Sequence, residues 1–365
     1  MDISAVDNRS KKVVAAKTLL GADAPSRARN AVRAGDVIIA TTRPNLNAVA
    51  CIPLELDESV CSTGFCVLRP SKCVDADFLF YTVQTPAFVE ALTELARGAN
   101  YPAVSDKQVL SQPVELPDLP TQRRLATHLK SQMTAVEETR RRVEEQAKAA
   151  ASLPTRLLKE IFQEDETNEW PVRSVGDACD FLPARSINLK GTAAVRAVTT
   201  ACLQETGFTE SGVKDALMME DDVADARISS GEIMIARSNT PALVGRVALF
   251  EGSKQPLVAS DLTIRLRARD GVVPAYAAAW FSYLFVTGYW QERASGASDT
   301  MKKIGRAQLA ATDIPIPPLK TQRQIAARLR EQFTHLQQLQ KALGTQLEAL
   351  DKLPGAFLRE AFGSL

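Results

Sequence analysis

One stretch of this sequence occurs twice, at a constant offset of 200 residues. Residues 117–163 read PDLPTQRRLATHLKSQMTAVEETRRRVEEQAKAAASLPTRLLKEIFQ, and residues 317–363 read PPLKTQRQIAARLREQFTHLQQLQKALGTQLEALDKLPGAFLREAFG. Sixteen of the 47 aligned pairs are identical without a gap. An internal repeat of this length indicates that the chain is built from two related halves.

Each copy predicts a long amphipathic helix, because its apolar residues recur at steps of three, four and seven. We expect Thr121 and Thr321 to be N-caps, and Pro154 and Pro354 to interrupt each helix after about thirty residues, or about 45 Å. The two stripes keep the same phase: Leu125, Leu129, Met133, Val136, Val143, Ala147, Ala150, Leu157 and Ile161 in the first, and Ile325, Leu329, Phe333, Leu336, Leu343, Leu347, Leu350, Phe357 and Ala361 in the second.

A helix with so narrow an apolar seam needs another helix to bury it, and the obvious partner is the other copy. An antiparallel pair would carry one module at each end. In the alternative, the two helices are independent and each packs only on its own module. The shared register of the two stripes favours pairing, so we expect an antiparallel coiled coil.

The segments outside the repeat predict two α+β modules, because short β-branched runs alternate with polar turns and are followed by a helix. Residues 35–40 match residues 231–236, so the modules are themselves related. The expected strands are 37–42, 65–68, 233–236, 247–250 and 262–266, and the expected helices are 78–95 and 276–290. The predicted organisation is module 1–116, helix 117–163, module 164–316 and helix 317–365.

Composition excludes several classes of protein. A net charge of +1 excludes a uniformly basic nucleic-acid coat, although it allows local basic patches. The most apolar window, residues 275–286, is too short to span a bilayer, and the first residues predict no secretory signal. The six cysteines are unevenly spaced and form no CxxC pair, which favours reduced thiols in a cytoplasmic protein.

Motifs for catalysis, cofactors and metals are missing from the sequence. It contains no GxxxxGK[ST] loop, GxGxxG turn, GxSxG elbow or HExxH pair. Cys61, Cys66 and Cys73 do not have the spacing of a zinc finger, and neither His128 nor His335 has a second ligand nearby in the sequence. We therefore expect a recognition or scaffold protein with no catalytic residue, cofactor or metal.

Polar loops at matching places in the two modules suggest binding of double-stranded DNA. Arginine reads guanine with two hydrogen bonds and asparagine reads adenine, whereas Ser, Thr, Lys and backbone amides hold phosphates. In the alternative these loops are ordinary polar turns. The candidate DNA-binding residues are Arg27, Arg29, Arg43, Asn45, Asn47, Asn100, Tyr101, Arg237, Ser238, Asn239, Thr240, Arg246, Ser298, Thr300, Lys302 and Lys303.

With these features together, the chain resembles the specificity subunit of type I restriction-modification systems. Two copies of Pro-x-Leu-x-Thr-Gln-Arg-x-[Leu/Ile]-Ala, at 117–126 and 317–326, each open a long helix with a Leu-Pro near its end. The Gly-[Asp/Glu]-[Val/Ile] strand, the Arg-containing loop after it and the Ser-Gly-Ala segment at 295–297 are also similar to that family.

The resemblance implies two target-recognition domains that read a split DNA sequence, with paired helices as the spacer between them. It also implies docking of methyltransferase (M) subunits, which bind S-adenosylmethionine, and, through the complex, of restriction (R) subunits; none of that catalysis belongs to this polypeptide. One departure is that residues 168–196 of the second module have no counterpart in the first. We expect either a truncation relative to the family or a missing part supplied by another chain.

Two other functions compete with DNA recognition. The chain is, in one alternative, a coiled-coil scaffold whose modules bind proteins and whose DNA recognition is lost or partial. In the other it is an enzyme with an unfamiliar site.

Overall fold

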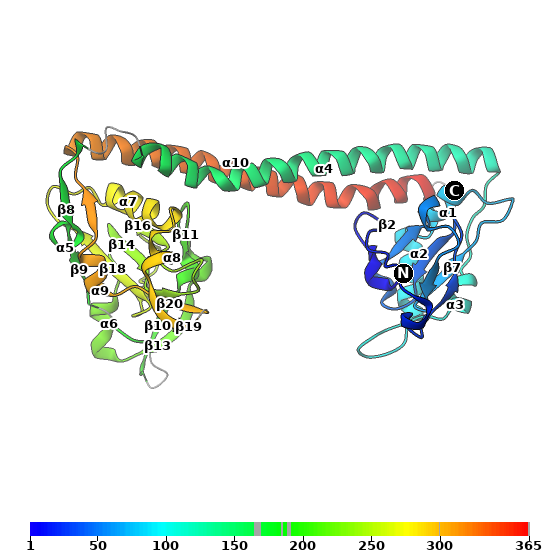
Figure 1. The fold of residues 1–365 in the computed structure, drawn as a ribbon, viewed down its shortest axis with the longest axis horizontal. Helices are drawn as coiled ribbons and strands as arrows, with labels where there is room; N and C mark the ends of the chain where they lie inside the picture. Colours follow the sequence, from blue (N-terminus) through cyan, green and yellow to red (C-terminus); the bar gives the residue numbers. More distant parts are fainter. Residues whose placement is uncertain (164–168, 184, 188–190, 299, 364–365) are drawn as a thin grey trace. The chain divides into compact units, whose positions relative to one another are not determined.

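The computed structural model describes residues 1–163, 169–183, 185–187, 191–298 and 300–363. The chain folds into two compact units, of which unit 1 comprises Met1–Glu145 with Leu343–Leu365 and unit 2 comprises Gln146–Ala342. Each unit contains one α+β module and a segment of both long helices (Figure 1). We call the α+β part before residue 117 module 1. The α+β part between the two long helices is module 2.

The long helices are α4 (Leu119–Phe162) and α10 (Leu319–Phe362), each of 44 residues and about 66 Å long at 1.5 Å per residue. Both continue through Pro154 and Pro354, so the predicted interruption is wrong. A proline inside a helix removes one hydrogen bond and costs about 3 kcal/mol. The turn after each proline buries an apolar side chain, Leu158 or Leu358, and we attribute the continuation of the helix to this packing.

The predicted N-caps are also wrong. Asp118 precedes α4 and its Oδ1 accepts a hydrogen bond from the backbone N–H of Thr121 at 3.1 Å. Pro120 lies in the first turn, where a missing N–H costs nothing because the first four N–H groups of a helix have no partner within it. The helix therefore starts before Thr121, and α10 likewise starts before Thr321.

Within each unit the two helix segments pack antiparallel. In unit 1, Ala126 and Leu129 of α4 join one apolar cluster with Leu358 of α10. In unit 2, Leu158 and Ile161 of α4 join another with Leu329 of α10. The start of one helix thus faces the end of the other in both units, which confirms the predicted antiparallel coiled-coil pairing.

The buried positions of the two helices recur mainly every seven residues. This spacing is the signature of a coiled-coil seam. It differs from the predicted stripe at Leu157 and Phe357, which are only half-buried because Leu158 and Leu358 take the core positions. The buried residues at these steps are Leu129, Val136, Val143 and Ala150 in α4, and Leu329, Leu336, Leu343 and Leu350 in α10.

Module 2 is built on an antiparallel four-stranded sheet in the order β16-β14-β18-β9. Side chains of β14 alternate between two cores: Ile233 and Ile235 pack under the helices, and Met234 packs on the opposite face. The sheet and its helices are β16 (Val247–Phe250), β14 (Glu232–Ala236), β18 (Thr263–Ala268), β9 (Cys179–Phe181), α5 (Val175–Ala178), α7 (Pro274–Val286), α8 (Tyr289–Arg293) and α9 (Arg306–Ala310).

Smaller sheets complete module 2. A two-stranded sheet joins β8 (Val172–Ser174) to β21 (Asp313–Pro315). The opposite face of the main sheet is covered by β10 (Ala193–Val198), β11 (Leu203–Gln204), β12 (Gly207–Phe208), β13 (Lys214–Met218), α6 (Glu220–Ala226) and β17 (Val258–Ala259). Another sheet, in the order β15-β20-β19, contains β15 (Ser238–Asn239), β20 (Met301–Lys303) and β19 (Ser295–Ser298).

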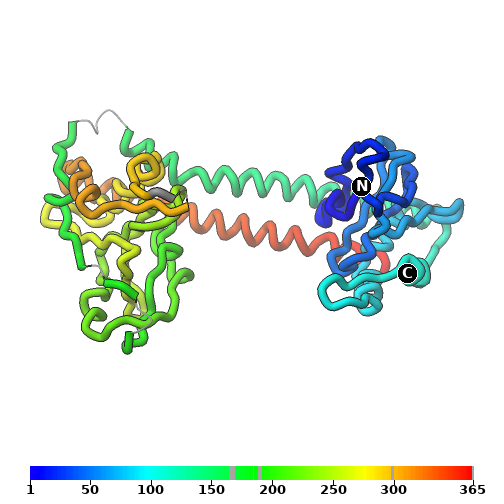
Figure 2. The backbone as a smooth tube through the Cα atoms, turned by 60° about the horizontal axis from the view of Figure 1, so that its bottom comes forward, coloured from blue at the N-terminus to red at the C-terminus, as the bar shows by residue number. Residues whose placement is uncertain are grey.

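Module 1 has the same plan with fewer strands. Its main sheet has the order β5-β4-β7, and the blue N-terminal segment and the red end of α10 lie in this same unit (Figure 2). Its elements are β1 (Val6–Asp7), β2 (Lys12–Val13), β3 (Ala28–Ala31), β4 (Val37–Ala40), β5 (Val49–Cys51), β6 (Val60–Ser62), β7 (Phe65–Leu68), α1 (Ala76–Thr82), α2 (Pro86–Leu95) and α3 (Asp106–Leu110).

Strand register shows that the two modules are structurally equivalent. Val37 of β4 faces Leu68 of β7, and Ile233 of β14 faces Leu266 of β18 in the same way. The four predicted strands nearest the sheet centre, 37–42, 65–68, 233–236 and 262–266, therefore form two matching β-ladders. Pairs of positions can therefore be compared directly between the two modules.

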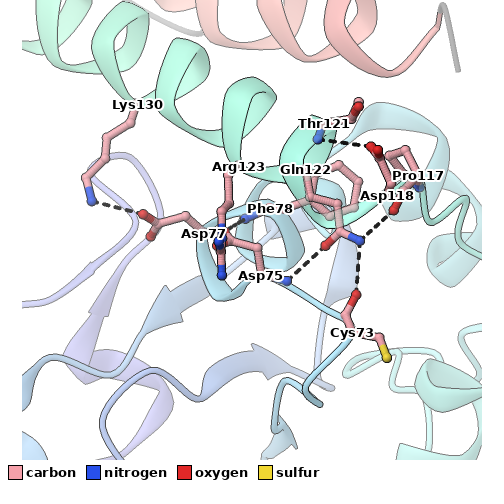
Figure 3. A network of polar contacts seen from close by, with 10 residues as sticks. All are labelled: Cys73, Asp75, Asp77, Phe78, Pro117, Asp118, Thr121, Gln122, Arg123 and Lys130. Carbon is pink, nitrogen blue, oxygen red and sulfur yellow. Dashed lines mark hydrogen bonds and ion pairs between the residues drawn. The ribbon is translucent and has the colours of Figure 1, made fainter.

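A buried glutamine from the repeated Thr-Gln-Arg motif fastens each module to its long helix. The Oε1 of Gln122 accepts the backbone N–H of Asp75 at 2.9 Å, and its Nε2 donates to the carbonyls of Cys73 (3.1 Å) and Pro117 (2.8 Å) (Figure 3). Two surface ion pairs, Arg123–Asp75 and Lys130–Asp77, lie beside it. The amide thus joins the first turn of α4 to the loop that starts α1.

Gln322 repeats this arrangement in unit 2. Its Oε1 accepts the backbone N–H of Val273 at 2.8 Å, and its Nε2 donates to the carbonyls of Gly271 (3.0 Å) and Pro317 (2.8 Å). Both glutamines are buried, so their three hydrogen bonds are made without competition from water. We call each arrangement a glutamine clamp, and it explains why this motif opens both helices.

The seam predicts a clear stability contrast within α10. Leu329→Ala should lower the free energy of unfolding by about 3 kcal/mol, because Leu329 is buried between α4 and α7 in the unit 2 cluster. Urea denaturation measures this change. The control Leu339→Ala, on the same helix but exposed, should change it by less than about 0.5 kcal/mol. Equal effects would contradict the buried seam.

The clamp predicts a local effect of Gln122→Leu. The substitution keeps the volume but leaves the Asp75 N–H and two carbonyls without their partner, which should cost about 3 kcal/mol. Native-state hydrogen exchange should show faster exchange at the Asp75 amide. Gln338→Leu, on an exposed face of α10, is the control and should leave that amide unchanged. An unaltered Asp75 exchange rate in Gln122→Leu would mean that the clamp does not hold the loop.

Candidate nucleic-acid interface

In module 1 the candidate loop begins where β4 ends. Arg43 and Asn47 adopt left-handed backbone conformations, with φ of 53° and 48°, on either side of the short 3-10 helix Pro44–Leu46. The backbone N–H of Arg43 donates to the carbonyl of Pro102 at 2.7 Å, and that of Val104 donates to the carbonyl of Thr41 at 2.9 Å. The loop is therefore held against residues 97–104, which the sequence places far away.

Three predicted residues meet at this junction. The Arg43 guanidinium lies 4.9 Å from the centre of the Tyr101 ring and donates to the carbonyl of Asn100 at 3.3 Å. Both side chains are exposed, with Tyr101 at 70%. Asn45, on the same loop, is exposed as well. The cluster presents a planar cation and an aromatic ring to solvent, groups that suit contacts with base edges and bases.

Arg27 and Arg29 lie next to the same end of the sheet. The carbonyl of Arg27 accepts the N–H of Thr63 at 2.8 Å, and the carbonyl of Gly64 accepts the N–H of Thr41, also at 2.8 Å. Arg29 donates to the carbonyl of Ser26 at 2.7 Å and remains exposed. The polar segments predicted to bind DNA in module 1 are thus side by side.

Asn47 differs from its neighbours because it is half-buried. The Nδ2 of Asn47 donates to the carbonyl of Gln84 at 3.4 Å, and the backbone carbonyl of Asn47 accepts a hydrogen bond from Lys11 Nζ. Burial lowers the pKa of Lys11 to about 8. These contacts place Asn47 under the loop, where it supports the backbone around Arg43.

In module 2 two separate candidate segments form one sheet. Ser238 and Asn239 of β15 pair with Lys303 and Lys302 of β20. Lys302 Nζ donates to the carbonyl of Gly296 at 3.1 Å, and Lys303 is exposed. Thr240 and Thr300 are exposed at the ends of these strands.

Ser298 pairs through its backbone with Met301 in β19, and its side chain lies outside the described part of the structure.

A glycine permits the loop closure in each module. Gly98 and Gly296 have φ of +117° and +144°, where side chains are strained. A Cβ on Gly98 would lie 2.9 Å from the carbonyl oxygen of Tyr101, and one on Gly296 would lie 2.6 Å from that of Met301. The Arg-Gly and Ser-Gly segments therefore have equivalent roles: in each, the glycine lets the loop close so that the candidate residues lie together.

Arg306 belongs to the module 2 cluster but was missed from the sequence. The backbone N–H of Ile304 donates to the carbonyl of Arg237 at 2.8 Å, which places the Arg306 segment beside Arg237. Burial and then the charge of Arg237 lower the pKa of Arg306. Arg306 donates to the carbonyl of Leu182 at 2.7 Å, and Arg237 to that of Asp261 at 3.3 Å. Such a pair attracts an anion. Arg306 is the first residue of helix α9, so it lies outside the polar loops from which the candidate residues were predicted.

Arg246 lies apart from this cluster. Its guanidinium lies 5.8 Å from the Phe285 ring of α7 and donates to the carbonyl of Leu203 at 3.5 Å. It is half-buried between the sheet, α7 and β11. The side chain therefore packs inside the module, while the other candidates of module 2 lie around β15 and β20.

Other arginines near the sheets are bound to carboxylates and have a structural role. Arg69 pairs with buried Asp36 at 2.7 Å. Burial alone would raise the pKa of Asp36, but the hydrogen bonds from Arg69 and the Arg33 backbone hold it below its usual value. At the equivalent place in module 2, buried Glu232 binds Arg265 at 2.8 Å and Arg267 at 3.2 Å.

No metal site and no membrane-spanning helix occur in the part of the chain that the structure describes. That part contains no group of three or more His, Cys, Asp and Glu residues able to hold a metal ion. His128 and His335 are exposed on the long helices. None of the described helices is both long and apolar enough to cross a bilayer.

Comparison with known proteins follows the same division of the chain. The model of the family described as "Type I restriction modification DNA specificity domain" matches residues 14–145 and 168–349. The StySPI specificity subunit of Salmonella potsdam, a type I restriction enzyme component, is 21% identical over 344 residues, which cover 90% of this chain and 74% of that protein.

Two solved structures resemble the whole chain. One comes from work titled "Structural basis underlying complex assembly and conformational transition of the type I R-M system". It has a TM-score of 0.80 and 30% sequence identity, and the match covers 99% of this chain and 90% of that chain. The HsdS subunit from Thermoanaerobacter tengcongensis has a TM-score of 0.63 and 28% identity, covering 99% and 89%. The chain therefore belongs to the type I restriction modification DNA specificity family, as the non-catalytic subunit that provides DNA sequence specificity.

Proposed function

We propose that this subunit reads a bipartite DNA target, with one part read by each module and the gap between the parts set by α4 and α10. In this proposal residues 1–116 and 164–316 are the target-recognition domains, and residues 117–163 and 317–365 are the spacers. DNA recognition is the function of the family. The two-part reading is our extension of it to this chain.

One observation supports the two-part reading above the others. Both modules place a cluster of polar and cationic side chains at the same end of the same sheet, where β4 or β14 ends. The clusters differ in content: Arg43, Asn100 and Tyr101 in module 1, against Asn239, Lys302 and Lys303 in module 2. Equivalent positions with different side chains suit two readers of different half-sites.

Roles within each cluster follow from exposure and partners. Arg43 and Asn45 are exposed on their loop, so we propose them as base readers of module 1. Arg237 is half-buried beside Arg306, and we propose that this pair binds a phosphate or a guanine edge. We assign Asn47 and Arg246 to support of the loops because both are half-buried against the module interior.

The proposed partners are methyltransferase subunits docked on the long helices and restriction subunits bound through the resulting complex. S-adenosylmethionine would bind to the methyltransferase subunits, so this chain requires no cofactor. Its net charge of +1 is low for a DNA-binding protein, and partner subunits would supply much of the contact with phosphates. The complex would act in the cytoplasm.

Arg237→Ala tests base reading by module 2. If Arg237 contacts a base, the substitution should cost about 1–3 kcal/mol of binding at one position of the target and relax specificity there. Binding of the complex with its methyltransferase partner to a library of duplexes, at fixed salt, measures this. Arg269→Ala is the matched control, because Arg269 is exposed, pairs with Asp180 at 2.8 Å and follows the Ala268 end of β18, opposite the end that adjoins Arg237.

A loss of binding affinity that is the same for all DNA sequences would instead indicate that Arg237 contacts a phosphate. Equal affinity of the unmodified complex for its target and for scrambled DNA would remove the two-part reading altogether, and would favour a protein scaffold.

Lengthening the spacer tests the role of the helices. Seven residues inserted after Glu145 and seven after Ala342 would keep the seam in phase, because its period is seven. Each insertion adds about 10 Å to its helix, close to the length of three base pairs. The preferred gap in the target should increase by about three base pairs in methylation or binding assays. An unchanged gap would show that the helices do not set the spacing.

A further inference from the structure

A short β-hairpin in each module lies between the candidate reading loop and the long helices. In module 1 it consists of β1 and β2, and it follows the 3-10 helix Ile3–Ala5. In module 2 it consists of β11 and β12, and it follows the 3-10 helix Thr200–Cys202. Both hairpins lie beside an edge strand of the main sheet, β5 in module 1 and β16 in module 2. They are therefore equivalent elements of the two modules.

The hairpin of module 1 is bound to both long helices by ion pairs. Arg9, in its turn, pairs with Asp351 of α10 at 2.7 Å and with Glu144 of α4 at 3.7 Å. Lys12 of β2 pairs with Glu137 of α4 at 3.4 Å, and β2 lies next to the C-terminal half of α10 (Figure 1). Because Arg9 contacts two helices at once, the hairpin is attached to the helix pair.

Two features strengthen these surface ion pairs. Asp351 also binds Arg140 of α4, so the charges form a network, whereas an isolated exposed pair contributes about 0–1 kcal/mol. The turn itself is ordered by Asp7, whose Oδ1 accepts the backbone N–H of Arg9 at 2.9 Å and whose Oδ2 accepts the hydroxyl of Ser10 at 2.9 Å. Arg9 therefore loses less conformational entropy when it binds the helices.

Lys11 connects the same turn to the reading loop. Its Nζ donates to the backbone carbonyl of Asn47, which ends the loop that begins at Arg43. Burial lowers the pKa of Lys11 to about 8, and the nearby charge of Asp7 offsets only part of this effect. Burying an ammonium group against a carbonyl costs free energy, so stability does not explain this contact. Its place between the hairpin and the loop suits a role in positioning the loop.

Module 2 makes the same two connections with other side chains. On the helix side, Gln337 of α10 donates to the carbonyl of Thr206 in the hairpin turn at 3.3 Å. Gln337 is the repeat equivalent of Glu137, the partner of Lys12 in module 1. On the loop side, Arg246 donates to the carbonyl of Leu203 in β11 at 3.5 Å.

Strand register shows that the loop contacts are also equivalent. The N–H of Ala40 donates to the carbonyl of Ala48, and the N–H of Ala236 donates to that of Arg246, both at 2.8 Å. Asn47 and Arg246 are therefore adjacent positions at the end of the reading loop. The cation comes from the hairpin in module 1 and from the loop in module 2. The same junction is thus made in both modules by different residues.

We propose that each hairpin couples the long helices to the reading loop of its module and so fixes where that loop lies. Lys11 and Arg246 are the positioning residues on the loop side, and Arg9 is the positioning residue on the helix side of module 1. The effect on DNA rests on the proposed function, because a misplaced loop loses discrimination between bases. The proposal adds specificity residues that contact no base themselves.

Distance from the glutamine clamp explains why a second attachment matters. The hairpin meets α4 at Glu137 and Glu144, about 22 and 33 Å beyond Gln122 at 1.5 Å per residue. A module held at the clamp alone could rotate about that point. A second attachment further along the helix removes this freedom, so the direction of the reading loop follows that of the helix pair.

Hydrogen exchange of the full chain tests the coupling without DNA. The double variant Arg9→Gln/Lys12→Gln removes the three ion pairs between the hairpin and the helices, and both side chains are exposed, so it should fold. The Asn47 amide, which donates to the carbonyl of Pro44 at 2.9 Å, should exchange about three- to tenfold faster.

A matched control removes the same charge from the same unit. Arg141 and Arg142 are exposed on α4 and pair with Glu145 and Glu138 of that helix. The variant Arg141→Gln/Arg142→Gln should leave exchange of the Asn47 amide unchanged. Equal acceleration in both double variants would show a general effect of charge and would overturn the coupling.

Lys11→Met separates positioning from stability. It should accelerate exchange of the Asn47 amide by a similar factor, because the contact with the loop is lost. It should not lower the melting temperature by more than about 3 °C, because a costly buried charge is lost with it. Faster exchange throughout the module with a larger fall in melting temperature would mean a structural role and would overturn the proposal.

DNA binding tests the consequence for specificity. With the methyltransferase partner and a library of duplexes at fixed salt, Lys11→Met and Arg9→Gln/Lys12→Gln should each lose at least about threefold in base discrimination. The loss should fall in one half of the target, the same half for both variants. No discrimination by the unmodified complex would count against the two-part reading and leave the exchange results standing. Discrimination that both variants retain, or lose equally in both halves, would overturn the coupling.

Discussion

The structure depends on the burial of two narrow apolar stripes. Each long helix carries buried residues at seven-residue steps, a pattern too narrow for packing on a globular core and suited to another helix. The buried residues of the two helices keep the same register, so the start of each helix packs against the end of the other. Each unit therefore contains a helix pair whose two segments come from distant parts of the sequence. The rest of each unit is assembled on that pair.

The glutamine clamps transmit the position of the helices to the modules. A single buried amide in each unit fixes the first turn of a helix, the linker before it and the loop that starts α1 or α7. The same helices of the module pack under β4 or β14, whose ends carry the candidate reading loops. A short series of rigid contacts therefore runs from the seam to the proposed DNA-binding residues, which suits a protein that must present them at fixed places.

Sequence predicted the periodic features well and the tertiary ones poorly. Repeat, helix pairing and most central strands follow from spacing, which is a local property. The continuation of α4 through Pro154 does not, because burial of Leu158 outweighs a local penalty. Arg306 was missed and Arg246 was selected for similar reasons: whether an arginine meets another cation or an aromatic ring depends on strands that pair only in the folded chain.

The two modules share one duplicated scaffold and differ in the side chains that their loops carry. Gly98 and Gly296 close equivalent loops, so the backbone at the reading end is alike in both modules. The side chains placed there are not: an arginine stacked on an exposed tyrosine in module 1 corresponds in module 2 to a lysine-bearing β-sheet beside the segments of Arg237 and Arg306. Because the clamps and main sheets are shared, the loops can change without disturbing the fold. Under the proposed function, such changes would alter the recognised sequence, and each half of the target could then vary independently.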